Sequence, residues 1–150
     1  MPAKKLLRKG KTFLFLPLRV KWLFIEALYT SAWVKLSLSF FPFKKVMGWL
    51  GKPQIETTAT ANPQTIATRK EVKRALELCN KYAPWPTECY TLSLTGKLLL
   101  QRRHIDSTLY IGFRKDEYNA YKGHAWLRAN DMYISGYKES VGFTIHSLFS

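Results

Sequence analysis

The chain has 150 residues, of which 47% are hydrophobic and 15% aromatic, and a net charge of +14. This length allows one domain with an appendage, and the apolar content excludes a disordered chain. Two cysteines, Cys79 and Cys89, are too few for a disulfide framework. The positive charge is concentrated at the start, because residues 1–52 contain eleven Lys and Arg and a single acid, Glu26.

The first predicted element is a helix over residues 18–40. Apolar residues recur there at helical spacing, namely Leu18, Trp22, Ile25, Tyr29, Ala32, Leu36 and Phe40. A narrow polar stripe consists of Arg19, Glu26, Thr30 and Ser37. Pro42 ends the helix, and residues 43–50 are predicted to form a short amphipathic continuation.

The apolar surface of this helix needs a cover. We expect it to pack on the rest of the chain, and docking on a membrane or on a partner protein is the alternative. A membrane span needs about 20 apolar residues, whereas the longest charge-free runs of the amino-terminal region, Ala27–Val34 and Leu36–Phe43, have eight each. Arg19 interrupts the apolar run after the basic start too early for a secretory signal. We therefore expect a cytoplasmic protein, with association to a membrane surface as an open option.

Residues 53–67 are rich in Thr, Ala, Asn and Pro and have no periodicity, which is typical of a linker. We therefore divide the chain into a basic, apolar, helical amino-terminal region (residues 1–52), this linker, and a carboxy-terminal domain (residues 68–150).

The carboxy-terminal domain is predicted to open with a helix over residues 69–82. Thr68 and Glu71 have the spacing of a capping box. Cys79 falls on the apolar face of this helix, where a cysteine usually acts as a small core residue.

Pro84-Trp85-Pro86 breaks that helix, and Thr87 is placed to cap the next one, which is predicted to run to about Arg103. Strand-forming residues then dominate four segments: 108–114, 121–128, 132–136 and 142–149. Ala129-Asn130-Asp131 supplies a turn between the second and third strands. Helices followed by an antiparallel meander predict an α+β fold.

Cys89 and His124 are the strongest candidate pair for chemistry. If Thr87 caps its helix, Cys89 lies in the first turn, where the backbone N–H groups and the helix dipole favour a thiolate. The same N–H groups can stabilise the oxyanion of a tetrahedral intermediate. His124 shares one strand face with Lys122 and Trp126, so a rigid strand holds the ring and Trp126 can shield it. Such a histidine can help form the thiolate and then protonate a leaving amine.

The other histidines and the metal-binding options are weaker. His104 lies at a helix end, where a positive charge is favourable to the helix dipole. His146 alternates with Thr144 and Leu148 on the last strand, which favours a structural role. No Cys/His cluster has zinc spacing, and no glycine-rich phosphate loop is present. We expect neither a metal nor another cofactor.

The segment from Trp85 to Gly136 resembles a known family. Five stretches in series carry the similarity: Trp85-Pro-Thr-Glu-Cys89, Lys97-Leu-Leu-Leu-Gln-Arg-Arg-His-Ile105, Thr108-Leu-Tyr-Ile-Gly-Phe113, His124-Ala-Trp-Leu-Arg128 and Asn130-Asp-Met-Tyr-Ile-Ser-Gly136. They resemble the stand-alone leader peptidases of lasso-peptide biosynthesis, a microcin-processing, transglutaminase-like family. The apolar helix that begins near Arg19 is similar to that family's opening helix.

The resemblance implies a papain/transglutaminase-like fold, in which a helix carrying Cys89 packs on an antiparallel sheet carrying His124. It implies a bacterial cysteine peptidase that removes the leader from a ribosomally made precursor peptide, with Cys89 as the nucleophile and His124 as the base. It also implies two partners, a separate leader-recognition protein and an ATP-dependent macrolactam synthetase that acts after cleavage. The basic, aromatic early helix is our candidate for their docking surface or for contact with a membrane, and no nucleic acid is expected.

The third catalytic residue of that family is an aspartate on the carboxyl side of the histidine. Asp131 is the only aspartate in this part of the sequence, so it is the candidate. A tight turn over residues 129–131, however, places Ser135 or Gly136 beside residue 124 and Asp131 about 23 Å away along an extended strand. This geometry favours a turn role for Asp131. A backbone carbonyl, Ser135 or Glu139 is the alternative partner for the imidazole.

Two other functions remain open at this point. One keeps the fold and the Cys89–His124 pair but transfers the acyl group to an amine rather than to water. The other is a non-catalytic basic module, in which the amino-terminal region binds a membrane or nucleic acid. The Lys and Arg residues of that region are scattered along an apolar helix rather than gathered in one strip, which favours the enzyme.

Overall fold

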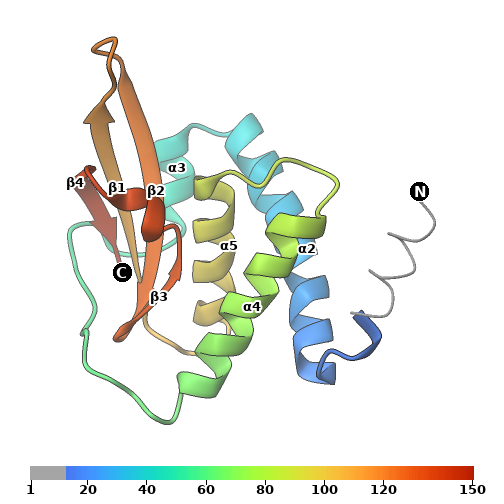
Figure 1. Cartoon of the computed structure of the whole chain (residues 1–150). Coiled ribbons are helices and arrows are strands. Elements are labelled where there is room, and N and C mark those ends of the chain that lie inside the picture. The colour runs from blue at the N-terminus through green and yellow to red at the C-terminus, as the bar shows by residue number, and fades with distance from the viewer. Residues whose placement is uncertain (1–12) are drawn as a thin grey trace.

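The computed structural model describes residues 13–150, in which helices precede strands (Figure 1). Along the chain these elements are α2 (Leu18–Phe40), α3 (Phe43–Gly48), α4 (Ile66–Tyr82), α5 (Cys89–Gln101), β1 (Thr108–Lys115), β2 (Tyr121–Ala129), β3 (Met132–Ser135), the 3-10 helix η1 (Lys138–Ser140) and β4 (Thr144–Phe149). The strands form one sheet in the order β3-β2-β1-β4, and every neighbouring pair is antiparallel. The predicted α+β fold is confirmed.

Helix α5 occupies the middle of the molecule, with the sheet on one side and α2 and α4 on the other (Figure 1). Its residues Leu94, Leu99 and Leu100 are fully buried. They belong to one hydrophobic core together with Ala27 of α2 and Leu127 of β2. The expectation that the early helix packs on the rest of the chain is therefore confirmed, and α2 shares its core with the strands.

The face of α2 that packs inward, which includes Leu23, Ala27 and Val34, is not the apolar pattern predicted from the sequence. Trp22 and Tyr29 of the apolar pattern are exposed, whereas Thr30 and Ser37 of the predicted polar stripe are buried. The polar side has a partner beyond α5, because Arg102 Nη1 donates a hydrogen bond of 3.1 Å to Thr30 Oγ1. Contacts from a distant part of the chain therefore decide which side of this helix faces the core.

Helix α4 begins at Ile66, so the predicted capping box at Thr68 is wrong. The fully buried Arg69 accounts for the earlier start. Its Nε donates a hydrogen bond of 3.1 Å to Thr65 Oγ1, and its Nη2 donates one of 2.9 Å to the carbonyl of Asn62. These bonds anchor the chain ahead of Thr68 and extend the helix toward its amino terminus.

The beginning of the predicted linker is held against the sheet. We call residues 52–58 the strap, which passes along the side of the sheet away from the helices (Figure 1). The backbone N–H of Gln54 donates to the carbonyl of Leu148 over 2.8 Å. Arg128 of β2 donates to Glu56 Oε1 over 2.8 Å and also to backbone carbonyls of the strap. The strap thus contacts the end of β4 and the side chains of Tyr110 and Arg128 on the outer face of the sheet.

Candidate active site

Cys89 is the first residue of α5, which follows the proline-rich break after α4. Glu88 occupies the N-cap position, so the predicted cap by Thr87 is wrong; the hydroxyl of Thr87 instead donates to Asn80 Oδ1 over 2.7 Å. No side chain caps α5 among the described residues, and the first bond of the helix runs from Leu92 N–H to Glu88 carbonyl. The N–H groups of the first turn are therefore directed toward the space beside Cys89, where they favour negative charge.

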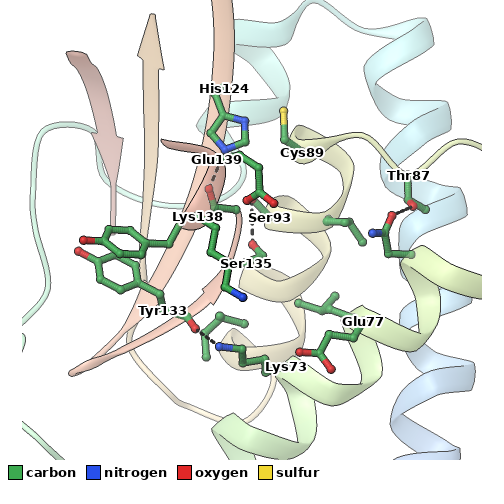
Figure 2. Close-up of a pocket in the computed structure, with 16 residues that line it drawn as sticks. Lys73, Glu77, Thr87, Cys89, Ser93, His124, Tyr133, Ser135, Lys138 and Glu139 are labelled. Carbon is green, nitrogen blue, oxygen red and sulfur yellow. Dashed lines mark hydrogen bonds between the residues drawn. The ribbon is translucent and has the colours of Figure 1, made fainter. Parts of the chain in front are cut away.

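His124 lies on β2 and is nearly buried, with 8% of its surface exposed. Its Nε2 is 2.7 Å from the carbonyl oxygen of Gly136. Because a carbonyl can only accept a hydrogen bond, Nε2 carries the proton and the neutral ring has its lone pair on Nδ1. Figure 2 shows this second ring nitrogen on the side that faces the sulfur of Cys89. The tautomer is thus the one that accepts a proton from the thiol.

Aromatic rings hold the imidazole of His124 from two sides. The indole of Trp126 is stacked at 6.0 Å between ring centroids, as its place on the same strand face led us to expect. The ring of Phe143, from the loop before β4, lies at 5.2 Å. Tyr110 of β1 stacks in turn on Trp126 at 5.6 Å. This row of rings limits rotation of the imidazole and excludes water from part of its surface.

Gly136 lies beside His124 because β3 is short and ends at Ser135. The last residue of β3, Ser135, pairs with Leu127, so the edge of β2 is no longer covered by a strand at His124. Gly136 then turns the chain with φ of +72°, a conformation that glycine adopts without strain. A Cβ at this position would lie 2.5 Å from the carbonyl oxygen of Ala125. The absence of a side chain at Gly136 thus lets its carbonyl approach the ring.

Two contacts that the sequence analysis did not identify bring α5 close to β2 at the site. The hydroxyl of Ser93 donates to the carbonyl of Ala125 over 3.2 Å and lies 2.9 Å from the hydroxyl of Ser135. A Cβ at Gly123 would lie 2.6 Å from the hydroxyl of Tyr90, so only glycine allows this approach. The sequence could have indicated Ser93, because it lies one helical turn after Cys89 and so on the same side of the helix. For Gly123 the sequence gives no indication except that it precedes His124.

Cys89 and His124 line the same cavity, which has a volume of about 600 Å³ (Figure 2). The cavity extends from them along α4, β3 and η1. Charged side chains also line it, namely Lys73, Glu77, Lys138 and Glu139. The ammonium of Lys73 donates to the carbonyl of Tyr133 over 3.0 Å. Burial raises the pKa of the Tyr90 hydroxyl next to this site, and negative charge at Cys89 raises it further.

The structure does not bring Asp131 to this cavity. Asp131 lies in the turn between β2 and β3, where its Oδ1 accepts a hydrogen bond of 2.7 Å from Arg69 Nη1. This bond lowers the pKa of the carboxyl group. The orienting position beside His124 is occupied instead by the Gly136 carbonyl, one of the alternatives considered above. Asp131 therefore supports the turn and the start of α4 rather than the imidazole.

The second cysteine has a different environment. Cys79 is fully buried in the core, as expected, and its thiol donates to the carbonyl of Ala27 over 3.8 Å. Burial raises the pKa of this thiol, which keeps it protonated. Among residues 13–150, no group of three or more His, Cys, Asp or Glu side chains is arranged to hold a metal ion.

Comparison with known families agrees with this geometry. Residues 37–147 match the family described as the transglutaminase-like superfamily, and this match covers more than half of the chain. The chain belongs to the transglutaminase-like superfamily. A transglutaminase-like fold is typically that of a cysteine peptidase or an acyltransferase. No curated protein and no solved structure matches the chain. Between residues 13 and 150, none of the helices has the length and apolar character that crossing a membrane requires.

Proposed function

We propose that this chain is a cysteine peptidase that removes the leader from a ribosomally made lasso precursor peptide. The observation that carries the chemistry is the arrangement of Cys89 and His124 in one cavity, with the ring held through Nε2 by the Gly136 carbonyl. Membership of the transglutaminase-like superfamily supports thiol-based acyl chemistry. The choice of substrate rests on the resemblance of residues 85–136 to lasso leader peptidases.

The first chemical step forms a thioester. Nδ1 of His124 accepts the thiol proton of Cys89, and the sulfur attacks the carbonyl carbon of the scissile peptide bond. The oxyanion that results is stabilised by the free N–H groups at the start of α5, and one such donor typically lowers the barrier by about 3 kcal/mol. The bond between carbon and nitrogen then breaks as the imidazolium gives its proton to the leaving amine.

The second step regenerates the enzyme. His124 takes a proton from a water molecule, whose oxygen attacks the thioester carbon. The bond between carbon and sulfur breaks, and the thiolate recovers a proton from the imidazolium. Throughout both steps the Nε2 proton remains on the ring and is donated to the Gly136 carbonyl, which keeps Nδ1 directed at the reacting atoms.

The proposed peptidase works with two other proteins in the cytoplasm. A separate leader-recognition protein presents the precursor to the cavity, and a macrolactam synthetase closes the ring of the released core peptide. The mixed charge of the cavity lining, with two lysines and two glutamates, suits an extended peptide with polar side chains.

Replacement of the proposed nucleophile tests this function. Cys89→Ala is expected to abolish cleavage of a precursor peptide in the presence of its leader-recognition protein, because no sulfur remains to form the thioester. The reaction is followed by mass spectrometry, and circular dichroism checks that the variant is folded. Cys79→Ala is the matched control and retains cleavage. Undiminished cleavage by Cys89→Ala would refute the assignment of the nucleophile.

The same measurement separates hydrolysis from transfer. A peptidase adds one water across the cleaved bond, so the combined mass of the two products exceeds that of the precursor by one water. Acyl transfer to an added amine gives a product that carries the amine mass instead. An amine adduct as the main product would replace the peptidase by an acyltransferase with the same Cys89–His124 pair.

A further inference from the structure

The side of α2 that faces away from the core carries an apolar surface. Its members recur at spacings of three, four and seven residues: Leu18, Trp22, Tyr29, Trp33, Leu36 and Phe40. At 3.6 residues per turn these six side chains fall within an arc of about 60°. We call them the outer stripe. Trp22 is 66% exposed, and Tyr29 and Phe40 are each 77% exposed. A continuous aromatic surface of this kind usually marks a binding surface.

Polar contacts on the opposite side prevent α2 from rotating to bury the outer stripe. Ser31 is fully buried, and its hydroxyl accepts a hydrogen bond of 3.2 Å from Trp85 Nε1. Glu26 accepts a hydrogen bond of 3.0 Å from Arg102 and also pairs with Arg103. A rotation of the helix would break these bonds, so the outer stripe remains on the surface of the isolated chain.

The apolar surface continues onto α3. Trp49 follows α3, and its ring lies 6.1 Å from that of Trp33 and 5.3 Å from that of Phe41. Beside these rings is an apolar hollow of about 310 Å³, lined by Trp33, Val34, Val46, Trp49, Leu50, Leu94 and Leu98. The exposed apolar surface therefore spans two helices and includes a depression into which an apolar chain can enter.

Positive charge surrounds this surface. Lys44 and Lys45 of α3 are exposed, and Lys45 Nζ lies 4.9 Å from the ring of Phe41; Arg19 at the start of α2 is also exposed but lies 3.7 Å from Glu71. Glu26 is the only acidic residue among the first 52, and its charge is already balanced by Arg102 and Arg103. The face that carries the outer stripe is thus apolar at its centre and cationic at its margin, which is complementary to an anionic lipid surface.

We propose that the outer stripe and α3 dock the protein on the surface of an anionic lipid bilayer. Trp and Tyr side chains favour the interface between headgroups and acyl chains. Helix α2 is about 35 Å long, from 23 residues at 1.5 Å each, and lies flat on the bilayer because its other side is packed on α4 and α5. The cavity with Cys89 is lined by residues of other elements than α2 and α3.

Flotation of the full chain with lipid vesicles tests this proposal. The wild-type chain is expected to float with vesicles of phosphatidylcholine and phosphatidylglycerol and to remain unbound with phosphatidylcholine alone. The triple variant Trp22→Ser/Tyr29→Ser/Phe40→Ser should bind the anionic vesicles about tenfold or more weakly, because it loses the apolar contacts while its charge is unchanged. These three side chains are exposed, so the variant keeps its core.

A charge variant and a matched control complete the experiment. Lys44→Gln/Lys45→Gln is expected to bind about 25-fold more weakly, since each lysine near an anionic surface contributes about 1 kcal/mol. Tyr118→Ser removes a ring that is 88% exposed in the β1–β2 turn and should bind as the wild type does.

Three results would overturn the proposal. Absence of flotation with anionic vesicles would exclude lipid, and equal flotation of the wild type and the triple variant would exclude the outer stripe. A wild-type dimer in sedimentation that the triple variant converts to a monomer, without lipid binding, would assign the face to a second copy of the chain. None of these readouts depends on peptidase activity, and Cys89→Ala should float like the wild type.

Discussion

One backbone oxygen, that of Gly136, replaces a carboxylate as the partner of the imidazole. A carbonyl fixes the tautomer of His124 as an aspartate does, because it only accepts a hydrogen bond. It would not neutralise the imidazolium that forms in the proposed reaction. In the proposed mechanism, that positive charge is stabilised by the negative thiolate and oxyanion beside it. The N–H groups at the start of α5 have no side-chain cap in the described chain, so they are available to stabilise this negative charge.

Gly136→Ala tests this contact. The new Cβ would lie 2.5 Å from the Ala125 carbonyl oxygen, and the alanine would have to adopt a positive φ. The backbone at residue 136 is therefore expected to move away from His124. We expect a loss of stability of about 1–3 kcal/mol. Alkylation of Cys89 by iodoacetamide, followed by mass spectrometry, should slow about tenfold because a displaced ring no longer takes the thiol proton.

Gly142→Ala is the matched control for Gly136→Ala. Gly142 also has a positive φ, of +83°, but its nearest neighbour would be 3.8 Å from a Cβ. This variant has the backbone strain without the clash and does not touch His124. It should lose stability while Cys89 reacts at the wild-type rate. Equal slowing in both variants would show that general destabilisation, rather than the Gly136 carbonyl, controls the thiol.

Lys97 makes stability depend on pH. Its side chain is buried on α5, 3% of the residue is exposed, and its ammonium donates to the Ser107 carbonyl over 3.0 Å. Burial lowers the pKa of Lys97 to about 8, although the charge of Asp106 opposes this shift. In the unfolded chain, the ammonium of Lys97 keeps its proton up to about pH 10. Between these values the unfolded state binds more protons, so the free energy of unfolding rises with pH by up to about 3 kcal/mol.

Urea denaturation of Lys97→Met checks this pH dependence. Tyrosines and cysteines titrate in the same range, so the informative quantity is the difference between the variant and the wild type. The variant should be the more stable protein near neutral pH, and its advantage should decrease as the pH is raised toward about 10. A difference that stays constant with pH would contradict the assignment of the buried charge to Lys97.

At the scale of elements, the helix α2 cannot be separated from the rest of the chain. Leu23, Ala27 and Val34 belong to the common core, and each is at most 5% exposed. Burying a Leu or Val side chain contributes about 1.5–3 kcal/mol, and the methyl group of Ala27 adds about 0.8 kcal/mol. Their combined contribution is comparable to the total stability of a small domain, about 5–15 kcal/mol. We therefore expect the rest of the chain to fold only when α2 is present.

Deletion of residues 1–41 tests the role of α2. The shortened chain is expected to lack a cooperative urea transition and a near-ultraviolet circular dichroism signal, because the core loses one of its layers. Deletion of residues 1–12, which leaves α2 complete, is the control and should retain both. A cooperative transition in the chain without α2 would instead support an independent domain over residues 68–150.

The strap and β3 act together on the position of His124. Arg128 fastens the strap to one face of β2, while Ser93 joins α5 to the other side of the site through Ala125 and Ser135. Because β3 ends at Ser135, no strand pairs with β2 at His124, and the carbonyl of Gly136 contacts the ring there. Contacts from the strap, β3 and α5 thus help to determine where the ring lies.

At the scale of the whole molecule, charge and chemistry are segregated. The basic excess lies in the first 52 residues, whereas the cavity is formed by α4, α5 and the sheet. The outer stripe lies on α2, which is on the far side of the molecule from the sheet (Figure 1). In our proposal this separation lets a lipid surface hold the enzyme while a peptide occupies the cavity.

The sequence by itself determined the elements and the pair Cys89 and His124. Helical periodicity, the prolines around Trp85 and the β-branched strands are local signals, because they depend on neighbours within a few residues. The order of a cysteine helix and a histidine strand followed from them, and so did the α+β class. Helix starts were less accurate at Ile66 and Cys89, since buried Arg69 and the bond from Thr87 to Asn80 replaced the predicted caps.

Only the tertiary structure decided which group holds the imidazole and which side of α2 meets solvent. The role of Gly136 depends on the end of β3 and on an irregular register beside Leu127, which no local pattern specifies. Asp131 matched the expected chain order but is held by Arg69, a residue 62 positions away in sequence. Likewise, the apolar pattern of α2 predicted a buried face, whereas Arg102 and Trp85 bind its polar side. Local sequence preferences allow more than one partner for His124 and more than one orientation of α2. Contacts between residues distant in sequence determine which of these arrangements forms.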